Sequence, residues 1–256
     1  MVDNNPASRQ GWAVPVLVSL AILLPQSASL FQASSTATVV TAAEWLTNGM
    51  IQSISQVVLL VVIIGASGRS REFGLDKPRP RDVPTGALIF GGMLLIGRMV
   101  TVIVTMLDPA AGGAVAGSRN LPSALPAALS QGASLSPVAA LALSTGFSLA
   151  SAYREELFYR AYLLGSCRQR YAPSAAAIAV SVALFTWSHA YQGPAGMVGS
   201  ALIGLFLAIA WTRGASVHAL AWGHAAYNLG ILLTLSQFQK PVIFEIGFAV
   251  SRITCE

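Results

Sequence analysis

The sequence has few charged residues. Only 10% of its 256 residues are Asp, Glu, Lys or Arg, whereas 54% are hydrophobic. A soluble domain carries about 25% charged residues, so the charges here are too few to cover a water-facing surface. In a bilayer the outer surface can be apolar, provided that backbone polar groups are satisfied within the protein. The composition therefore excludes an ordinary soluble enzyme and predicts an integral, multi-pass membrane protein.

Cysteine is also scarce. The chain has two cysteines, Cys167 and Cys255, and the expected topology places them on opposite faces of the membrane. We therefore expect no disulfide between them. Cys255 is the next-to-last residue, whereas a prenylation box needs its cysteine four residues from the end. The chain is thus not expected to be prenylated itself.

Long apolar runs dominate the rest of the sequence. A membrane-spanning helix needs roughly 20 mainly apolar residues, and seven segments meet this requirement. They are residues 12–33, 49–66, 85–107, 137–169, 174–191, 197–212 and 216–236. The first is the weakest, because Pro25, Gln26 and Ser27 interrupt it, and a signal peptide is the alternative. We predict an all-α, polytopic bundle of about seven transmembrane helices that encloses a polar cavity.

Basic residues are concentrated between the second and third segments. Five lie there, namely Arg69, Arg71, Lys77, Arg79 and Arg81. The positive-inside rule places this solvated loop, residues 67–83, in the cytoplasm, and the loop 108–136 outside. The N-terminus is then cytoplasmic, and we expect the plasma membrane. No soluble module surrounds these residues, so a nucleic-acid patch is disfavoured.

Ionisable side chains inside membrane helices are costly, and they usually mark functional sites. Here they are Glu155, Glu156 and Arg160 in the fourth segment, His189 in the fifth, and His224 in the seventh, with the polar Asn228 beside it. Glu155 and His189 are each 17 residues from Ala172, in the turn between their helices. At about 1.5 Å per residue the two side chains should be level. His224 and Asn228 are four residues apart, so they share a helix face.

The two neighbouring acids are expected to differ in role. Glu156 and Arg160 have the spacing and order that favour an intrahelical ion pair, which makes two buried charges tolerable. Glu155 has Tyr159 at that spacing instead. A carboxyl group in an apolar site is a good general base when a histidine lies nearby. For either histidine alone, the alternative is a packed imidazole bonded to a backbone carbonyl.

Three motifs carry a resemblance to a known family. They are Glu155-Glu156-x-x-x-Arg160, Phe185-x-x-x-His189 and His224-x-x-x-Asn228. In this order, on successive membrane helices, they resemble the signature motifs of the CPBP family, which includes type II CAAX prenyl endopeptidases and bacteriocin-processing relatives. Phe73-Gly74-Leu75 in the basic loop also resembles a frequent feature of that family. The resemblance divides the chain into N-terminal helices over 1–136, a catalytic core over 137–237 and a tail over 238–256.

The resemblance also implies roles for the motif residues. Glu155 and His189 would activate a water molecule, His224 and Asn228 would stabilise the oxyanion, and Glu156 and Arg160 would support them. This family has been described both as metal-dependent and as a metal-free glutamate peptidase. A zinc ion held by Glu155, His189 and His224 is one alternative. The H-E-x-x-H pattern is absent, and activation of water by Glu and His needs no metal. We therefore expect no cofactor, with zinc as the alternative.

The function expected from these residues is hydrolysis of a peptide bond near the membrane. The expected partners are a peptide or protein substrate and the lipid bilayer, and no nucleic acid. A prenylated C-terminus and a leader peptide are both compatible substrates, and no residue indicates the oligomeric state. One alternative is a proton-linked carrier, which the lack of visible inverted repeats disfavours. Another is a catalytically silent immunity or scaffold protein of the same fold.

Overall fold

Seven long helices make up the part of the chain that the structure describes. The computed structural model describes residues 13–31, 41–68, 70–107, 135–169 and 174–237, and these contain no strand. The helical elements are α1 (Ala13–Phe31), α2 (Ala42–Ala66), α3 (Asp82–Leu107), α6 (Pro137–Glu155), η3 (Glu156–Leu164), α7 (Gly165–Gln169), α8 (Ser174–Ser188), η4 (Ala190–Gln192), α9 (Gly193–Thr212) and α10 (Val217–Gln237). Each predicted segment has its helix, so the all-α prediction is confirmed.

Local capping signals fix where two of these helices begin. At the start of α2, the backbone N–H of Thr41 donates to Glu44 Oε2 at 2.8 Å, and Glu44 N–H donates to Thr41 Oγ1 at 3.2 Å. This reciprocal pair satisfies backbone donors that a helix end leaves free. It extends α2 seven residues upstream of the predicted start at 49. At the start of α6, Ser136 accepts from Ala139 N–H, and Pro137 occupies the first turn.

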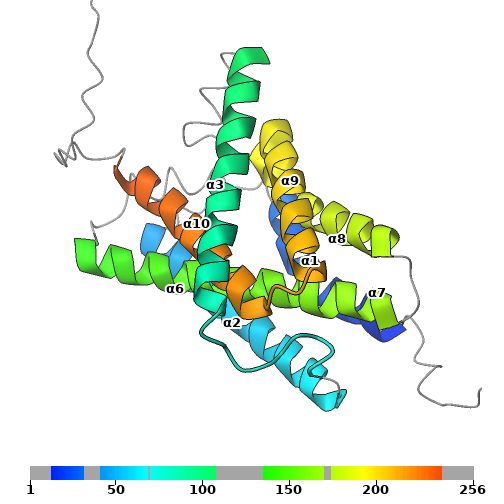
Figure 1. Ribbon diagram of the computed structural model, residues 1–256. Helices are drawn as coiled ribbons and strands as arrows, with labels where there is room; N and C mark the ends of the chain where they lie inside the picture. Colours follow the sequence, from blue (N-terminus) through cyan, green and yellow to red (C-terminus); the bar gives the residue numbers. More distant parts are fainter. Residues whose placement is uncertain (1–12, 32–40, 69, 108–134, 170–173, 238–256) are drawn as a thin grey trace, which may run out of the picture.

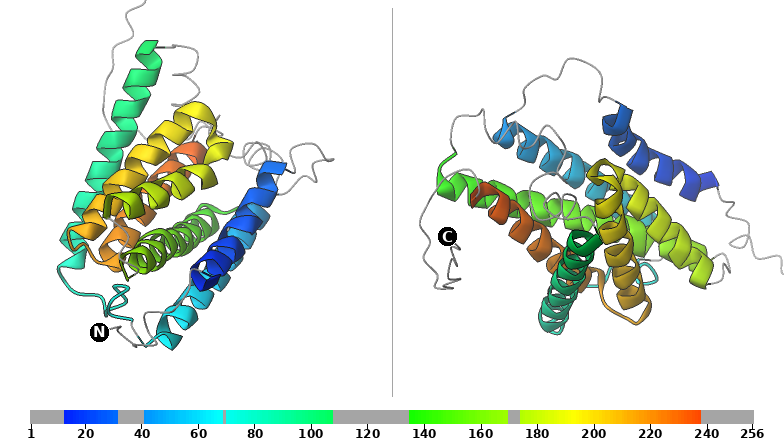
Figure 2. Two further views of the ribbon diagram at one scale, coloured as in Figure 1. Left: turned by 90° about the vertical axis from the view of Figure 1, so that its right-hand side faces the viewer. Right: turned by 90° about the horizontal axis from the view of Figure 1, so that it is seen from above.

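A single long rod forms the centre of the bundle. Elements α6, η3 and α7 follow one another without a break, and Figure 1 shows them crossing the lower half of the molecule. Helices α2 and α10 flank α6, the α8–α9 hairpin lies over η3 and α7, and α3 crosses α10 at a steep angle (Figures 1 and 2). The rod therefore contacts most of the other helices, and residues near its middle lie at the centre of the molecule.

Two glycines allow α3 and α10 to cross closely. A Cβ atom on Gly223 would lie 2.6 Å from the carbonyl oxygen of Gly86, and one on Gly86 would lie 3.2 Å from that of Ala219. Small residues of this kind let helix backbones approach in membrane proteins. The close crossing positions α10, which carries His224 and Asn228.

The outer surface of the bundle suits a lipid environment. Three helical segments are long and apolar enough to cross a membrane, namely Ala42–Ala66, Asp82–Leu107 and Ala190–Thr212. Large apolar side chains face outward, and Leu88, Met106 and Leu107 are 76%, 78% and 81% exposed. In water such a surface would be unfavourable. The chain is therefore an integral membrane protein.

The basic loop is more ordered than the predicted solvated linker. Phe73 is buried against Tyr162 of the rod, at 6.1 Å between ring centroids, and Leu75 packs on the same core. Gly74 has a φ of 72°, in the left-handed region that favours glycine. Residues 77–81 remain exposed. The solvated-loop prediction is therefore wrong for residues 73–75, because Phe73 and Leu75 supply apolar surface that docks on the bundle.

Some predictions fall on residues outside the described ranges. These include the one for Cys255, the loop 108–134, the turn that contains Ala172, and the tail 238–256. The orientation of the N-terminus stays a prediction, since residues 1–12 lie outside those ranges as well.

Candidate active site

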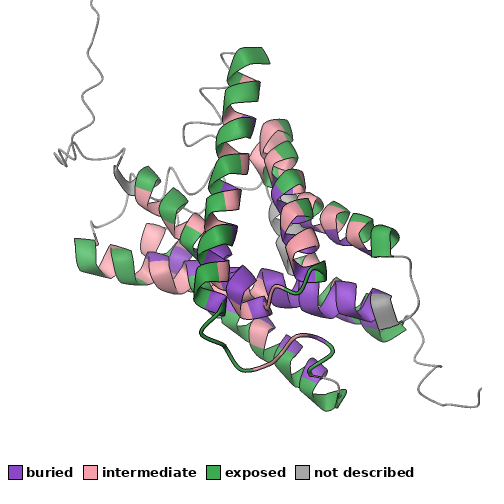
Figure 3. Ribbon diagram, viewed as in Figure 1, coloured by how far each residue is buried: buried purple, intermediate pink, exposed green. Residues whose placement is uncertain are grey.

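The middle of the rod is a π-helix in which every residue is buried. Over Glu156–Leu164 all nine residues are buried, and Figure 3 shows this stretch as the most continuous run of buried residues in the rod. Ser181 of α8 donates a hydrogen bond to the carbonyl of Tyr159, at 3.0 Å, within this segment. Short π segments inside α-helices are rare and occur frequently at functional sites. The acidic motif begins where the rod changes from α to π.

Glu156 lies at the centre of a fully buried network of charged groups. Its Oε1 accepts a hydrogen bond from Arg160 Nη1 at 3.1 Å and lies 2.8 Å from His224 Nδ1. Both Glu156 and Arg160 are 0% exposed. The predicted ion pair between them is thus confirmed. The contact with His224 comes from α10, 68 residues further along the chain, and it fixes the orientation of that imidazole.

Arg160 is enclosed by groups from two other helices. Its Nη2 donates to the carbonyl oxygen of Gly204 on α9 at 3.3 Å, and its guanidinium carbon lies 4.6 Å from the centre of the Phe185 ring. A Cβ on Gly204 would lie 2.9 Å from Phe185 Cδ1, so glycine leaves the room that these two side chains use. The small residues Ser200, Gly204 and Ala208 of α9 are buried on this face.

Glu155 lies beside this network, and its two carboxylate oxygens differ: one accepts a hydrogen bond from a described residue and the other does not. Arg154 donates a hydrogen bond to its Oε1 and forms an ion pair with it. Its Oε2 is buried, has no hydrogen-bond partner among the described residues, and lies 3.7 Å from His224 Nε2. That separation is too long for a direct hydrogen bond. One water molecule can bridge polar groups at such a distance.

His189 follows the last residue of α8 and is half-buried. Its Nδ1 lies 2.8 Å from the carbonyl oxygen of Phe185, so Nδ1–H donates and Nε2 keeps its lone pair in the neutral ring. The Phe185 ring is 4.5 Å from the His189 ring and 6.3 Å from that of His224, between centroids. His189 is also within electrostatic reach of Glu155. The Phe185 ring therefore packs against both histidines.

Asn228 is the motif residue that the structure links least to the others. It lies one helical turn after His224 on α10 and is half-buried. No hydrogen bond joins its side chain to any residue within the described ranges. The structure therefore brings Glu155, Glu156, Arg160 and His224 into mutual contact, connects His189 to them through Phe185, and leaves Asn228 one turn away.

The spacing of residues in the sequence did not indicate two contacts near the site. Arg154 and Glu155 are adjacent in sequence, and neighbouring residues on a regular helix do not face each other, so their ion pair was not predicted. His218, near the start of α10, joins two distant segments. Its Nδ1 lies 3.0 Å from Tyr153 Oη, and its Nε2 lies 2.7 Å from the carbonyl oxygen of Asp76. The docked loop is thus connected to the residues that precede Glu155.

The residues expected to hold zinc do not gather as a metal site. Among the described residues, no three His, Cys, Asp or Glu side chains are placed so that they could hold an ion. Glu155 Oε1 is bonded to Arg154, and His224 Nδ1 lies against Glu156. The zinc alternative therefore does not fit this arrangement, and the chemistry below is written for the chain's own groups.

Several buried polar atoms around Glu155 lack a partner within the described region. They include Glu155 Oε2, Glu156 Oε2, Tyr159 Oη and Arg160 Nε. Buried polar groups in proteins are nearly always hydrogen-bonded, to protein or to water. A cluster of unsatisfied donors and acceptors is therefore suited to bind water or a polar substrate group. Of this cluster, Glu155 Oε2 is the carboxylate oxygen nearest an uncommitted imidazole nitrogen.

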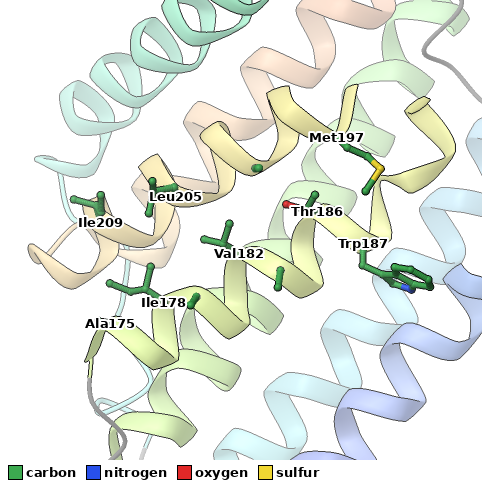
Figure 4. Close-up of a pocket in the computed structure, with 11 residues that line it drawn as sticks. Ala175, Ile178, Val182, Thr186, Trp187, Met197, Leu205 and Ile209 are labelled. Atoms are coloured by element: carbon green, nitrogen blue, oxygen red, sulfur yellow. The ribbon is translucent and has the colours of Figure 1, made fainter. Parts of the chain in front are cut away.

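An apolar groove lies next to this cluster, between α8 and α9. It has a volume of about 720 Å³, and no charged residue lines it. Figure 4 shows it extending from Ala175 and Ile209 at one end to Trp187 and Met197 at the other. Thr186 and Trp187 line the second end, two to three residues before His189. One end of the groove is therefore lined by residues that shortly precede His189 in the sequence.

Comparison with known protein families gives one match. Residues 137–230 match the family described as type II CAAX prenyl endopeptidase Rce1-like. Searches of curated proteins and of solved structures found no match. The matched residues run from the start of α6 into α10, and they include all three motifs. This region is similar to the Rce1-like family, and the resemblance to CPBP peptidases is confirmed at the level of this family match.

Proposed function

We propose that this chain, with its Rce1-like domain over residues 137–230, is an endopeptidase in which Glu155 and His189 activate water. The family supports a CAAX-type peptidase at a general level, and the roles of the residues are our inference. The observation that carries the proposal is the uncommitted Oε2 of Glu155, which lies 3.7 Å from His224 Nε2. A carboxylate oxygen and imidazole nitrogens that share a water molecule are the groups that general-base hydrolysis needs.

The proposed reaction is addition of water to a peptide carbonyl. Glu155 takes a proton from the water as its oxygen bonds to the carbonyl carbon, and His189 orients that water through Nε2. Asn228 donates a hydrogen bond to the resulting oxyanion. His224 donates a second one from Nε2–H as an imidazolium, with its Nδ1–H held by Glu156. The C–N bond then breaks, and the proton held by Glu155 passes to the leaving amine. No step uses a metal ion.

The surrounding groups have a positioning role in this scheme. Glu156 holds the His224 ring through Nδ1, and Arg160 keeps Glu156 in place. Arg154 fixes Glu155 through Oε1, so that Oε2 remains available. Preorganised groups of this kind lower the cost of reorganisation during the reaction.

The proposed substrate is a peptide held at the membrane by a lipid group or by its own apolar sequence. Thr186 and Trp187, which shortly precede His189, line one end of the apolar groove between α8 and α9, and such a groove suits a substrate with an apolar chain near its scissile bond. A prenylated C-terminus and an apolar leader peptide both fit this description. We place the reaction at the plasma membrane, with the N-terminus of the chain in the cytoplasm.

The first test is the loss of a single carboxylate. Purified protein in liposomes is incubated with a farnesylated CAAX-type peptide and, separately, with an apolar leader peptide, and cleavage is followed by mass spectrometry. Glu155→Gln should lower the rate by about 10²–10⁴-fold, the range typical of a lost general base. Glu72→Gln, in the exposed part of the basic loop, is the control and should cleave at the rate of the unmodified chain.

Three outcomes would count against the proposal. Full cleavage by Glu155→Gln would remove that residue from the mechanism. One zinc ion per chain, whose removal by a chelator abolishes cleavage, would replace the metal-free scheme. Proton flux across the liposome membrane, without cleavage of either peptide, would favour a carrier. Where neither peptide is cut by the unmodified chain, membrane peptides that accumulate in cells expressing Glu155→Gln identify the substrate to be tested.

A further inference from the structure

A second groove lies on a different face of α9 from the apolar one. It runs between the first turns of α3 and the end of α9, closed at one end by the turn 213–216, and its volume is about 520 Å³. None of the proposed catalytic residues lines it. The groove is therefore a separate feature of the molecule, and nothing in the proposed peptidase reaction uses it.

One end of this groove is basic. Arg81, just before α3, and Arg213, just after α9, both line it and are exposed. Within the described ranges, neither guanidinium has an ion-pair or hydrogen-bond partner. The acid beside them, Asp82, is buried and already accepts a hydrogen bond from Arg79 N–H at 2.7 Å. Two positive charges thus face the groove without a counter-charge from the chain that is free to meet them.

The rest of the groove is apolar. Along α3 the lining changes from Thr85 to Leu88, Ile89 and Gly92, and along α9 it changes from Arg213 to Ala210 and Phe206. Gly92 is about 16 Å along α3 from Arg81, at 1.5 Å per residue. A Cβ on Gly92 would lie 2.5 Å from Phe206 Cζ, so the glycine leaves space in which that ring can pack. Polarity falls in the same direction on both helices.

This order of charge and apolar surface matches the shape of a membrane lipid. Helix α3 and the segment containing α9 are two of the three that are long and apolar enough to span a bilayer, so the groove between them opens toward lipid. Its basic end adjoins the loop that carries five of the fifteen Lys and Arg residues of the chain. Guanidinium groups bind phosphate oxygens in a bidentate manner, and basic pockets between membrane helices bind anionic headgroups.

We propose that this groove binds an anionic phospholipid of the cytoplasmic leaflet. The headgroup phosphate lies between Arg81 and Arg213, and an acyl chain lies along Leu88, Phe206 and Ala210. The unpaired charge selects an anionic over a zwitterionic headgroup, and the apolar part selects a lipid over a free phosphate ion. Because α3 also crosses α10 at Gly86 and Gly223, the lipid occupies the space next to the helix that carries His224.

Native mass spectrometry of the full chain tests this proposal. The protein in detergent is titrated with phosphatidylglycerol and with phosphatidylcholine of the same acyl chains. The unmodified chain should retain phosphatidylglycerol preferentially. The double variant Arg81→Gln/Arg213→Gln should weaken that binding by about 30-fold, as expected for two charges near a headgroup. The control, Arg71→Gln/Lys77→Gln, removes the same charge from exposed positions that do not line the groove, and it should bind like the unmodified chain.

A second variant tests the apolar half without changing any charge. Ala210→Phe fills the groove and should weaken phosphatidylglycerol binding about tenfold, roughly the effect of a lost apolar contact. Equal binding of both lipids, or equal loss in the control double variant, would overturn the proposal. A second copy of the chain bound in place of lipid, seen as a dimer that Arg81→Gln/Arg213→Gln abolishes, would overturn it as well. Because no cleavage is measured, these outcomes are independent of the peptidase proposal.

Discussion

Two ion pairs of nearly equal length lie in opposite surroundings. Glu156 and Arg160 in η3 are 3.1 Å apart and wholly buried, whereas Asp76 and Arg79 in the basic loop are 3.0 Å apart, with side chains 41% and 48% exposed. The exposed pair competes with water and salt, and such pairs contribute about 0–1 kcal/mol. Burial, and not the separation of the charges, therefore decides how much each ion pair contributes to the structure.

The buried pair has acquired partners that the exposed pair lacks. Glu156 Oε1 is shared between Arg160 and His224, and Arg160 also contacts the carbonyl of Gly204 and the ring of Phe185. A buried ion pair is weak evidence for stability, since desolvation opposes the attraction between the charges. What this pair achieves is a fixed geometry in which two motif helices and α9 meet.

The largest difference between the two pairs is expected when one arginine is removed from each of them. Arg160→Met leaves the Glu156 carboxylate buried without its cation, which should destabilise the fold by about 3–5 kcal/mol. Arg79→Met should cost less than about 1 kcal/mol. Thermal unfolding in detergent, followed by circular dichroism and by the size-exclusion profile, measures both variants.

The double variant Glu156→Gln/Arg160→Met extends this measurement. It removes both charges and keeps groups of similar size, so it should recover much of the stability that Arg160→Met loses. It should not recover cleavage of the peptide, because Gln holds the His224 ring less firmly than a carboxylate does. Equal melting temperatures for Arg160→Met and Arg79→Met would show that burial does not separate the two pairs.

A smaller change tests the packing around the buried pair. A Cβ at Gly204 would lie 2.9 Å from Phe185 Cδ1, whereas one at Gly199 on the same helix would meet only Val100 Cγ1, at 3.9 Å. Gly204→Ala should therefore destabilise the protein by about 1–3 kcal/mol through overpacking. Gly199→Ala should be neutral or stabilising by up to about 1 kcal/mol, since alanine favours a helix.

These two substitutions are informative because the same change, Gly to Ala, should lower the free energy of unfolding at position 204 and should not lower it at position 199. Phe185 also contacts His189, so a displaced ring should reduce cleavage in Gly204→Ala more than the loss of folded protein explains. The readouts are the unfolding temperature and the cleavage rate per folded molecule. A neutral Gly204→Ala would mean that Phe185 has room to move, and it would weaken the account of its position.

Features that depend on local spacing could be predicted from the sequence. The helices followed from apolar runs, and the Glu156–Arg160 pair followed from a spacing of four residues in the favourable order. The place of Phe185 beneath His189 followed in the same way, because residues one turn apart share a face. In each case both partners lie in one helix, so the chain geometry alone brings them together.

Features that depend on tertiary contacts could not be predicted. The bond between Glu156 and His224 joins residues 68 positions apart, and spacing within one helix carries no information about it. The π-helix could not be predicted because the residues of this segment are equally compatible with an α-helix. The docking of Phe73 and Leu75 was missed because the surrounding charges and prolines indicated a solvated loop. Asn228 shares a helix face with His224 as predicted, but its role in catalysis stays a prediction.

The smallest expected effect concerns the contact between the basic loop and the rod. His218 bridges Tyr153 Oη and the carbonyl oxygen of Asp76, and each such hydrogen bond is worth about 0.5–1.5 kcal/mol. His218→Phe keeps an aromatic ring against Tyr153 and removes both bonds. It should speed amide hydrogen exchange in residues 71–76 by about tenfold, because these residues lose their hydrogen bond to α10. The exchange rate in η3 should change less, because η3 contacts α8, α9 and α10 in addition to Phe73 of the loop.

The exposed Lys77→Ala is the matched control in the same loop, and it should leave the exchange of residues 71–76 unaltered. The cleavage rate of His218→Phe separates two roles for the loop. If the loop only covers the end of the bundle, the rate should stay within about twofold of that of the unmodified chain, as for surface changes far from the reacting groups. A loss of cleavage as large as that expected for Glu155→Gln would instead place the loop in the catalytic machinery. The contrast between a buried, functional ion pair and an exposed, dispensable one would then fail, because both regions would be needed for the reaction.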